Sequence, residues 1–378
     1  MQFAIIGNPE NRRTQYFIDA VRSQGLKSPF VISWKEVLQS FSSVGPTLAK
    51  TNFLKIDSPG ENFQVDKRFL RLGAKNTKYA RSSRISQEKI NEMVFDKGRV
   101  GFLYQRHLGF QACLQRLEQE TKKYPKLRLF NSIKSILLMF DKIACHQYFQ
   151  NKNLPVPPAL YGINSYDDLQ TNMRQKSWKR VFIKPCYNSS ASGVIAYRIH
   201  KYKEQAITSA ELVRQGNSLR VYNSLKVRTY ESKQDIKDLI DFFAKEGVLI
   251  EKWQTKATTE KGAFDIRVVV TGGEAKHIVV RQGQSPMTNL HLGNQRADTA
   301  RIKDFLGKKI WADLLQLAEH AVSTLPGVLY VGMDIMINSR LKQCYILEAN
   351  AFGDLLPNVL SNGMDTYSTQ IHHLLSKQ

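Results

Sequence analysis

The sequence lacks the features that would place it in a membrane or in a disulfide-stabilised class. Its four cysteines form no CxxC pair and have no histidines at zinc-finger spacing; they are Cys113, Cys145, Cys186 and Cys344. No apolar run reaches the roughly 18 residues that a bilayer-spanning segment needs. With 42% hydrophobic and 10% aromatic residues, the chain is too apolar for a disordered class. We therefore expect a globular protein with four reduced cysteines and no structural zinc.

An export signal is also missing from the first residues. Met1 is followed by an apolar, strand-like stretch up to Gly7, and no basic segment precedes a long apolar core. We expect this stretch to form a first strand and the protein to be cytoplasmic.

Acidic residues are few relative to basic ones. The formal net charge is +22, and a field of that sign attracts partners rich in phosphate or carboxylate groups. The run from Lys67 to Arg84 holds seven basic residues and no acidic one. This run is either a solvated helix face or loop, or a groove for a polyanion. On a nucleic-acid surface, Phe69 or Tyr79 would stack on bases.

The first part of the chain alternates strand-like and helix-like patterns, which indicates a small α/β domain with parallel strands. The expected segments are strands at 3–6, 30–33 and 53–56, a helix at 13–21 and a mainly helical region at 86–122. The stretch GNPENRR after the first strand is not GxGxxG, so it predicts no dinucleotide site.

A domain boundary is indicated by a proline-rich stretch. Asn131 fits an N-cap for a helix over 132–150, and Pro155, Pro157 and Pro158 prevent its continuation. We expect an N-terminal α/β domain at 1–125 and a second unit at 126–378, with subdomains at about 155–250 and about 251–378. Strands of the second unit are expected at 181–184, 194–199, 248–251, 266–271, 275–281, 329–337 and 344–349.

Two strand-like stretches near the C-terminus carry oxygen-bearing side chains. Asp334 lies in GMDIMI, while Glu348 and Asn350 are two residues apart and project from one face of LEAN. A turn at 338–340 makes the two stretches an antiparallel pair. If these side chains meet, they offer oxygen ligands to a hard cation such as Mg²⁺, which keeps positions open for phosphate oxygens. The alternative is three polar groups at the rim of a sheet.

Other charged residues also lie at strand ends. Lys184 is followed by a loop of small and hydroxyl residues up to Gly193, which can hold a phosphate although it is no GxxxxGK[ST] motif. Glu251 ends the strand VLIEKW, and Asp265 and Arg267 share one face of FDIRVVV. The alternatives are a surface turn and an intrastrand ion pair of little energetic value.

In chain order, these pieces resemble the ATP-grasp family, and within it the carboxylate–amine ligases that form peptide bonds. The matching pieces are DK (Asp141–Lys142), IKP with SSASGV, EKW, DIR, VVR with TNLHLGN, MDI and LEAN. They cover roughly residues 130 to 375, and SPGE, NLHLGN and LEANAFGDLLP are similar to a poorly characterised bacterial subgroup. The resemblance implies an α/β (α+β) ATP-grasp fold behind a Rossmann-like N-terminal domain. It also implies amide formation through an acyl phosphate, with release of ADP and phosphate.

The resemblance further implies roles for individual residues. Those expected to bind ATP are Lys142, Lys184, Ser189, Ser190, Ser192 and Gly193 for the phosphates, Glu251, Lys252, Trp253 and Gln254 for adenine, and Asp265 for ribose. Those expected to stabilise the transferring phosphoryl group are Arg267, Arg281 and Asn289. One or two Mg²⁺ ions, or Mn²⁺ in their place, would be held by Asp334, Glu348 and Asn350.

Some features leave alternatives open. The flap begins Asn188-Ser189-Ser190 where relatives often have glycine first, and HLGN at 291–294 replaces a more basic, glycine-rich turn, so acceptor specificity is in doubt. Two other functions stay open: a kinase acting on a small polyanionic metabolite, and a nucleic-acid-binding protein without catalysis. We expect an acidic carboxylate or peptide and an amine as substrates and no membrane partner. Contact with tRNA and a homodimer are compatible with the sequence, which selects neither.

Isolated histidine, lysine and tryptophan residues carry smaller expectations. His291 is expected near the reaction centre, and His372 and His373 on a C-terminal amphipathic helix as surface or packing residues. Lys256 could reach the nucleotide or substrate, but an exposed side chain is the commoner outcome for a lysine and is the one expected here. Trp34 and Trp311 are expected in the core.

Overall fold

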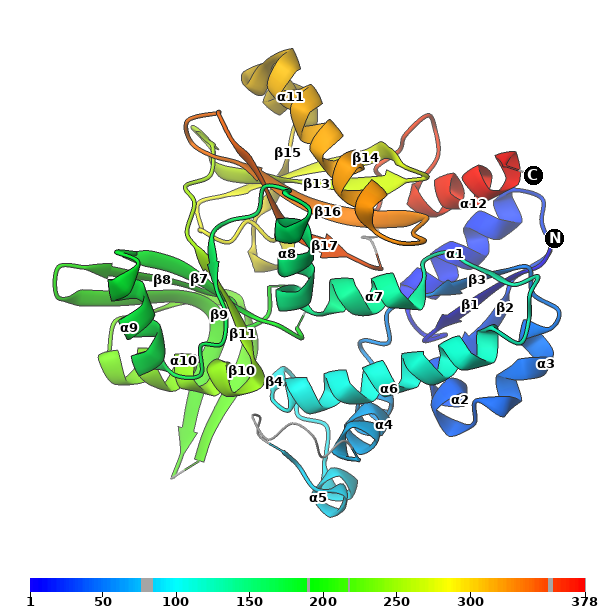
Figure 1. Cartoon of the computed structure of the whole chain (residues 1–378), viewed down its shortest axis with the longest axis horizontal. Helices are drawn as coiled ribbons and strands as arrows, with labels where there is room; N and C mark the ends of the chain where they lie inside the picture. Colours follow the sequence, from blue (N-terminus) through cyan, green and yellow to red (C-terminus); the bar gives the residue numbers. More distant parts are fainter. Residues whose placement is uncertain (76–83, 189–190, 217, 353–355, 378) are drawn as a thin grey trace.

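The computed structural model describes residues 1–75, 84–188, 191–216, 218–352 and 356–377 (Figure 1). In this part of the chain, three β-sheets carry the architecture, and helices cover their faces. The helices α7 (Ile133–Phe140) and α8 (Lys142–Asn151) lie in the middle of the molecule, between the N-terminal sheet and the two others. No helix among these residues has the length and apolarity needed to cross a bilayer.

The N-terminal sheet is parallel, in the order β2-β1-β3-β5. Its strands are β1 (Phe3–Gly7), β2 (Phe30–Ser33), β3 (Phe53–Ile56) and β5 (Arg128–Leu129). Its helical segments are α1 (Arg12–Ser23), α2 (Trp34–Gln39), η1 (Ser42–Val44), α3 (Gly45–Leu48), α4 (Phe63–Ala74), α5 (Gln87–Glu92) and α6 (Leu103–Thr121). Strands β1 and β3 are buried along their whole length, as short apolar strands between helices must be. The predicted parallel α/β arrangement is confirmed.

Helices α4 and α6 cross with their backbones in contact. A Cβ atom on Gly73 would lie 1.9 Å from the carbonyl oxygen of Gln105, and one on Gly109 would lie 1.8 Å from that of Phe69. Only glycine fits at these two positions. The close crossing buries Phe69 to 1% exposure, so the prediction that it stacks on nucleic-acid bases is wrong.

One basic residue of the same run also points inward. Lys67 is buried, and its ammonium group donates to the carbonyl oxygens of Asn91 at 2.9 Å and Met93 at 3.0 Å. Tyr79, with the rest of 76–83, lies outside the described residues.

The helix predicted over 132–150 is two helices, α7 and α8, which meet at Asp141. Ser132 caps α7, since its side chain accepts from the amide of Ser135, and Asp141 caps α8 by accepting from Ala144 at 3.0 Å. Because Asp141 has an extended backbone, the chain turns there, and Lys142 becomes the first residue of a new helix.

Asn131 was predicted as the helix cap and has a different role. Its amide nitrogen donates to the carbonyl oxygens of Tyr330 at 2.9 Å and Ala351 at 3.0 Å, and its amide oxygen accepts from the backbone of Leu329 at 2.9 Å. The buried side chain therefore joins the start of α7 to the start of β16 and to the residue after β17. The local sequence indicated a capping residue but not this long-range pairing.

The central sheet has the order β4-β10-β9-β8-β7-β11-β6, with antiparallel neighbours. Its strands are β4 (Arg99–Val100), β6 (Ala159–Leu160), β7 (Arg180–Pro185), β8 (Ile195–His200), β9 (Lys203–Gln215), β10 (Ser218–Tyr230) and β11 (Val248–Lys252). Helices α9 (Tyr166–Gln175) and α10 (Lys233–Glu246) cover it. Strand β4 comes from the N-terminal part of the chain, so this part extends the central sheet. The long β9–β10 hairpin was not predicted.

The C-terminal sheet has the order β15-β14-β13-β16-β17, and β12 pairs with β13. Its strands are β12 (Thr258–Thr259), β13 (Gly262–Thr271), β14 (Glu274–Gly283), β15 (Gln295–Ala297), β16 (Tyr330–Ile337) and β17 (Cys344–Asn350). Its helical segments are η2 (Leu290–Leu292), α11 (Thr299–Thr324) and α12 (Thr366–Ser376). Helix α11 covers one face of the sheet, and α12 lies against α1, which brings the two termini to the same side (Figure 1).

The predicted antiparallel pair of β16 and β17 is confirmed. Residues 338–343 connect the strands, and the amide of Asn338 donates to the carbonyl oxygen of Gln343 at 2.9 Å. Asp334 lies opposite Glu348, and the pairing then shifts so that Ile335 lies opposite Ile346. The shift leaves Leu347 as an extra residue, and such a bulge reorients the neighbouring side chains.

Several smaller expectations are confirmed. Trp34 and Trp311 are core residues with 0% and 6% exposure. All four cysteines are free thiols. His372 is exposed, and the ring of His373 packs over Gly272, where a Cβ atom would lie 2.0 Å from it.

Candidate functional site

A cavity of about 630 Å³ is lined by residues of the central and C-terminal sheets and by loops and helices next to the N-terminal sheet. Most of the predicted site residues lie on its wall: Lys142, Lys184, Ser192, Glu251, Lys252, Gln254, Asp265, Arg267, Arg281, Asn289, Asp334, Glu348 and Asn350. Of these predicted residues, Lys142 and Asn350 are 208 positions apart in the sequence, and the fold brings both to the same wall. The predicted roles of these residues stay predictions.

Two predicted residues have other surroundings. Gly193 has φ +73°, its amide donates to the hydroxyl of Ser209 at 3.2 Å, and a Cβ atom on it would lie 2.4 Å from Phe243. The glycine therefore serves packing and turn geometry. The ring of Trp253 packs on Phe182, with their centroids 4.9 Å apart. Ser189 and Ser190 lie outside the described residues.

Lys142 joins the base of the predicted flap to β17. Its ammonium group lies 2.7 Å from the Glu348 carboxylate and donates to the carbonyl oxygen of Asn188 at 2.7 Å. Burial by itself lowers the pKa of Lys142, but the Glu348 charge outweighs burial and raises that pKa. Lys142 is therefore a fixed positive charge on the cavity wall.

Lys184 and Glu251 form a second pair, between β7 and β11. The ammonium group of Lys184 lies 2.7 Å from Oε2 of Glu251 and donates to the carbonyl oxygen of Leu347 at 3.2 Å. The other carboxylate oxygen of Glu251, Oε1, is buried and has no hydrogen-bond partner among the described residues. An unpaired buried acceptor is costly, so this atom is suited to a donor from a bound molecule.

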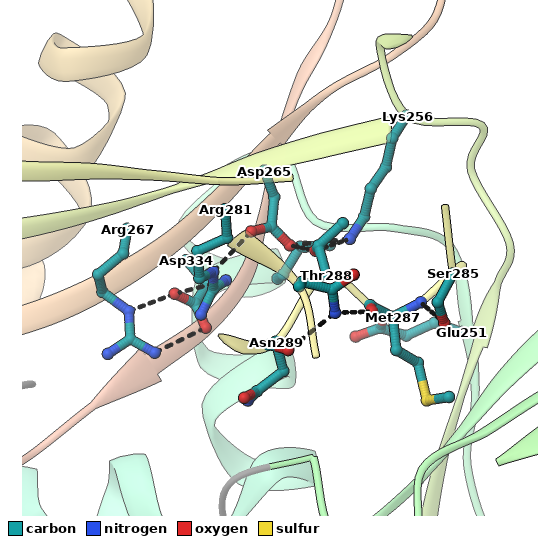
Figure 2. A network of polar contacts seen from close by, with 12 residues as sticks. Glu251, Lys256, Asp265, Arg267, Arg281, Ser285, Met287, Thr288, Asn289 and Asp334 are labelled. Atoms are coloured by element: carbon teal, nitrogen blue, oxygen red, sulfur yellow. Dashed lines mark hydrogen bonds and ion pairs between the residues drawn. The ribbon is translucent and has the colours of Figure 1, made fainter. Parts of the chain in front are cut away.

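A buried polar cluster lies on β13 and β14 and on the loop after them (Figure 2). Arg281 holds one oxygen of Asp265 at 2.7 Å, and Lys256 holds the other at 2.8 Å. Lys256 also donates to Thr288 at 2.7 Å, and Thr288 donates to Asp265. The side chain of Lys256 is only 10% exposed, so the expectation of an exposed lysine is wrong.

The same cluster continues onto β16. Strand pairing places Asp265 opposite Arg281, and Arg267 opposite Asp334. Two nitrogens of Arg267 donate to the carboxylate of Asp334, and Arg281 forms an ion pair with the same carboxylate at 3.0 Å (Figure 2). Asp265 and Arg267 share a face, as predicted, but each pairs with a neighbouring strand instead of with the other. Arg281 bridges both carboxylates.

The cluster holds one more cation than anions. Lys256, Arg267 and Arg281 face the two carboxylates of Asp265 and Asp334, and their side chains are at most 10% exposed. Burial by itself raises the pKa of both carboxyls, but the neighbouring cations outweigh it and lower both. Both acids are therefore ionised at neutral pH. Burial lowers the pKa of Lys256 and the charge of Asp265 opposes that shift, so an anion bound in the cavity would favour the charged form of Lys256.

The predicted metal ligands lie on adjacent strands. Asp334 is opposite Glu348, and Asn350 is held by a bond from its amide nitrogen to the carbonyl oxygen of Gly332 at 3.2 Å, which leaves its amide oxygen as the ligand atom. In the described parts of the chain, no cluster of three or more His, Cys, Asp or Glu side chains is placed to hold a metal ion. This oxygen-only set fits Mg²⁺ better than Zn²⁺, with phosphate oxygens completing the coordination.

Two residues of the predicted TNLHLGN turn lie on the same wall. The side chain of Asn289 accepts from the amide of His291 at 2.9 Å and so caps η2, and both residues line the cavity. His291 is exposed there, and its place near the reaction centre stays a prediction.

Sequence reasoning missed part of the lining. Its members are the polar residues Asn11, Arg12, Arg13, Ser58, Glu61, Arg106, Thr288 and Arg296 and the apolar residues Pro157, Phe182, Met336 and Leu347. The stretch GNPENRR lacks GxGxxG, but its position after a parallel strand is a signal in itself, because ligands bind beyond the carboxyl ends of such strands.

A family model matches more than half of the chain. The fold and the cavity define the class of ATP-grasp proteins, and residues 128–354 match the family described as "YheC/D like ATP-grasp". The chain belongs to this YheC/D-like ATP-grasp family, and the predicted resemblance to ATP-grasp proteins is confirmed. Among curated proteins, no sequence matches it.

Solved structures of similar fold agree with this assignment. The ATP-grasp ligase PsnB, complexed with the precursor peptide PsnA2 and AMPPNP, has a TM-score of 0.51 and 14% identity over 99% of this chain and 97% of that chain. D-alanine–D-alanine ligase from Bacillus anthracis, complexed with ATP, has a TM-score of 0.52 and 11% identity over 100% and 96%. The macrocyclase MdnC from Microcystis aeruginosa, bound with precursor peptide MdnA, has a TM-score of 0.52 and 11% identity over 100% of both chains.

Proposed function

We propose that the protein is an ATP-dependent carboxylate–amine ligase that forms an amide through an acyl phosphate. One observation carries this proposal: the buried cluster with its excess positive charge lines the same cavity as the Lys142 and Lys184 ammonium groups and the unpaired oxygen of Glu251. A site with positive charge for phosphates, an acceptor for an amino group and oxygen donors for a cation fits Mg²⁺ and ATP together.

ATP is placed by these complementary groups. The Oε1 atom of Glu251 would accept from the adenine amino group, and Phe182, Met336 and Leu347 supply apolar surface for the ring. Lys142 and Lys184 would contact the phosphates. Asp265, predicted for the ribose, has both oxygens bound to protein cations, as Asp334 has, so both carboxylates also orient those cations beside their predicted ligand roles.

Asp334, Glu348 and Asn350 would hold the magnesium. When bound, Mg²⁺ neutralises phosphate charge and orients the phosphates for in-line transfer. Arg267 bonds the same Asp334 carboxylate from the side of β13, which fixes the carboxylate in position for this role.

The protein's part in the reaction is alignment and charge neutralisation. A carboxylate oxygen of the substrate attacks the γ-phosphorus, the bond to the β-phosphate oxygen breaks, and ADP leaves. An amine then attacks the acyl carbon, loses a proton, and expels inorganic phosphate. Arg267 and Arg281 would stabilise the charge on the transferring phosphoryl group, with Asn289 beside them.

The class of substrate is supported by proteins of similar fold. PsnB and MdnC were solved with precursor peptides, and the Bacillus anthracis ligase with ATP. We therefore propose an amino acid or peptide as the carboxylate substrate and an amine as the acceptor. The cytoplasmic location, contact with tRNA and a homodimer stay predictions.

The mass of the product tests the proposal against a kinase. The full chain is incubated with ATP, Mg²⁺ and pools of amino acids and short peptides, and the products are analysed by mass spectrometry. A ligase yields a condensed product, lighter by one water than its two substrates together, with ADP and free phosphate in equal amounts. A stable phosphorylated substrate without free phosphate would contradict ligation.

A further inference from the structure

Part of the cavity wall is not used by the proposed nucleotide site. Arg12 and Arg13 follow β1 at the start of α1, and Glu61 follows β3. Two more arginines line this part, Arg106 from α6 and Arg296 from β15. Helices and a loop next to the N-terminal sheet thus supply three of these arginines and Glu61, and the C-terminal sheet supplies Arg296.

The topology of the N-terminal sheet places a binding crevice at this position. The chain passes from β1 to β2 on one side and then to β3 on the other, so the order reverses between β1 and β3. In open parallel sheets, ligands bind beyond the carboxyl ends of the strands at such a reversal. The loops that begin at the ends of β1 and β3 are the ones that line the cavity.

Two of these arginines are held in place by protein groups. Arg13 lies 3.5 Å from the buried carboxylate of Asp57 and donates to the carbonyl oxygen of Phe352 at 3.1 Å. Arg296 donates to the carbonyl oxygen of Pro357 at 2.7 Å, and among the described residues no carboxylate forms an ion pair with it. Arg12 is exposed on the cavity wall. Guanidinium groups arranged in this way are suited to carboxylates.

Glu61 has a strained backbone at the same place. Its φ is +69°, a conformation that a residue other than glycine adopts at a cost, and its carboxylate accepts from the side chain of Asn11 at 3.3 Å. Such strain persists where the surrounding structure imposes it and is frequent at binding sites. A carboxylate among arginines is suited to the ammonium group of an amino acid or peptide.

We propose that this part of the cavity binds an amino-acid or peptide substrate that carries at least two carboxylates. One carboxylate reaches Arg267 and Arg281 for activation, and Arg12 and Arg296 hold another. The position of the reacting carboxylate beside Arg267 and Arg281 rests on the proposed function. The recognition of acidic groups depends only on the arginines of this wall.

Calorimetric titration of the full chain tests the proposal. The protein is first titrated with a non-hydrolysable ATP analogue and Mg²⁺, and the saturated protein is then titrated with triglutamate or with trialanine. Triglutamate is expected to bind at least about tenfold more tightly than trialanine. Arg12→Gln and Arg296→Gln are each expected to weaken triglutamate binding by about tenfold and to leave the nucleotide affinity unchanged. Arg174→Gln, an exposed arginine of α9 away from the cavity, is the matched control and should change neither affinity.

The two titrations separate this inference from the proposed function. Three outcomes overturn the inference alone, provided that the nucleotide binds. The two peptides bind with equal affinity, neither peptide binds, or triglutamate binding is unaffected by both arginine variants. Arginine-dependent triglutamate binding without nucleotide binding supports the acidic site and overturns the proposed function. Absence of both kinds of binding overturns both.

Discussion

Glu348→Gln is expected to lower ATP-dependent ADP release by at least about a thousandfold. Glutamine keeps the shape of the side chain but removes the charge that pairs with Lys142 at 2.7 Å and that would ligate Mg²⁺ opposite Asp334. The effect is large because the charge lies where phosphoryl transfer is proposed. The release of ADP is measured at saturating ATP and Mg²⁺ with the peptide pools that support turnover.

The fold should survive this substitution. The Glu348 side chain is 31% exposed and the buried Lys142 keeps its hydrogen bond to Asn188, so the loss of the ion pair costs about 1–3 kcal/mol of the free energy of unfolding. Glu118→Gln on α6 is the matched control, because it removes an exposed pair with Lys122 outside the cavity. Wild-type activity in Glu348→Gln, with the control also active, would refute the metal-ligand role.

Arg267→Met is expected to abolish turnover and to destabilise the protein. It leaves the buried carboxylate of Asp334 with Arg281 as its remaining arginine partner, and breaking a buried pair costs about 3–5 kcal/mol. Arg267→Lys should not restore activity, since a single ammonium group cannot replace the two nitrogens that grip Asp334. Urea unfolding measures stability, and ADP release measures activity.

A double variant separates the two effects. Arg267→Met combined with Asp334→Asn removes both charges, so its loss of stability should be smaller than the sum of the two single losses. Its activity should stay as low as that of Arg267→Met. Full activity in Arg267→Met would contradict the role of this arginine in phosphoryl transfer, and additive stability losses would contradict the buried pair.

The parts of the fold that the sequence predicted are those set by local pattern. Runs of β-branched residues such as FDIRVVV and the apolar stretches around Asp334 identify buried strands, because burial on both faces requires nearly continuous apolar residues. Charged residues within or at the ends of such strands are costly unless they have partners, which is why Lys184, Glu251 and Asp265 were recognisable as candidate site residues.

The parts that were missed depend on contacts far apart in the sequence. The β9–β10 hairpin has strands rich in polar and charged residues, and its outer part is exposed, so it shows little apolar alternation. Asn131 resembles a helix cap locally, yet its partners lie about 200 residues further along the chain. Lys256 is an ordinary polar residue in sequence and is buried only because Asp265 and Thr288 face it.

Two residues of the basic run give no support to the nucleic-acid alternative. Lys67 points inward to backbone carbonyls, and Phe69 is in the hydrophobic core. Part of the positive charge of the chain lies at the cavity, whose lining holds ten lysine and arginine residues and five acidic ones. A phosphate-bearing cosubstrate and an acidic second substrate would suit this local excess.

Titration of the wild-type chain with a non-hydrolysable ATP analogue, with Mg²⁺ and then with EDTA, tests the central claim most directly. The account predicts binding at one site per chain, with affinity at least about tenfold higher in the presence of Mg²⁺. No detectable binding, or binding that is the same with and without the metal, would contradict it.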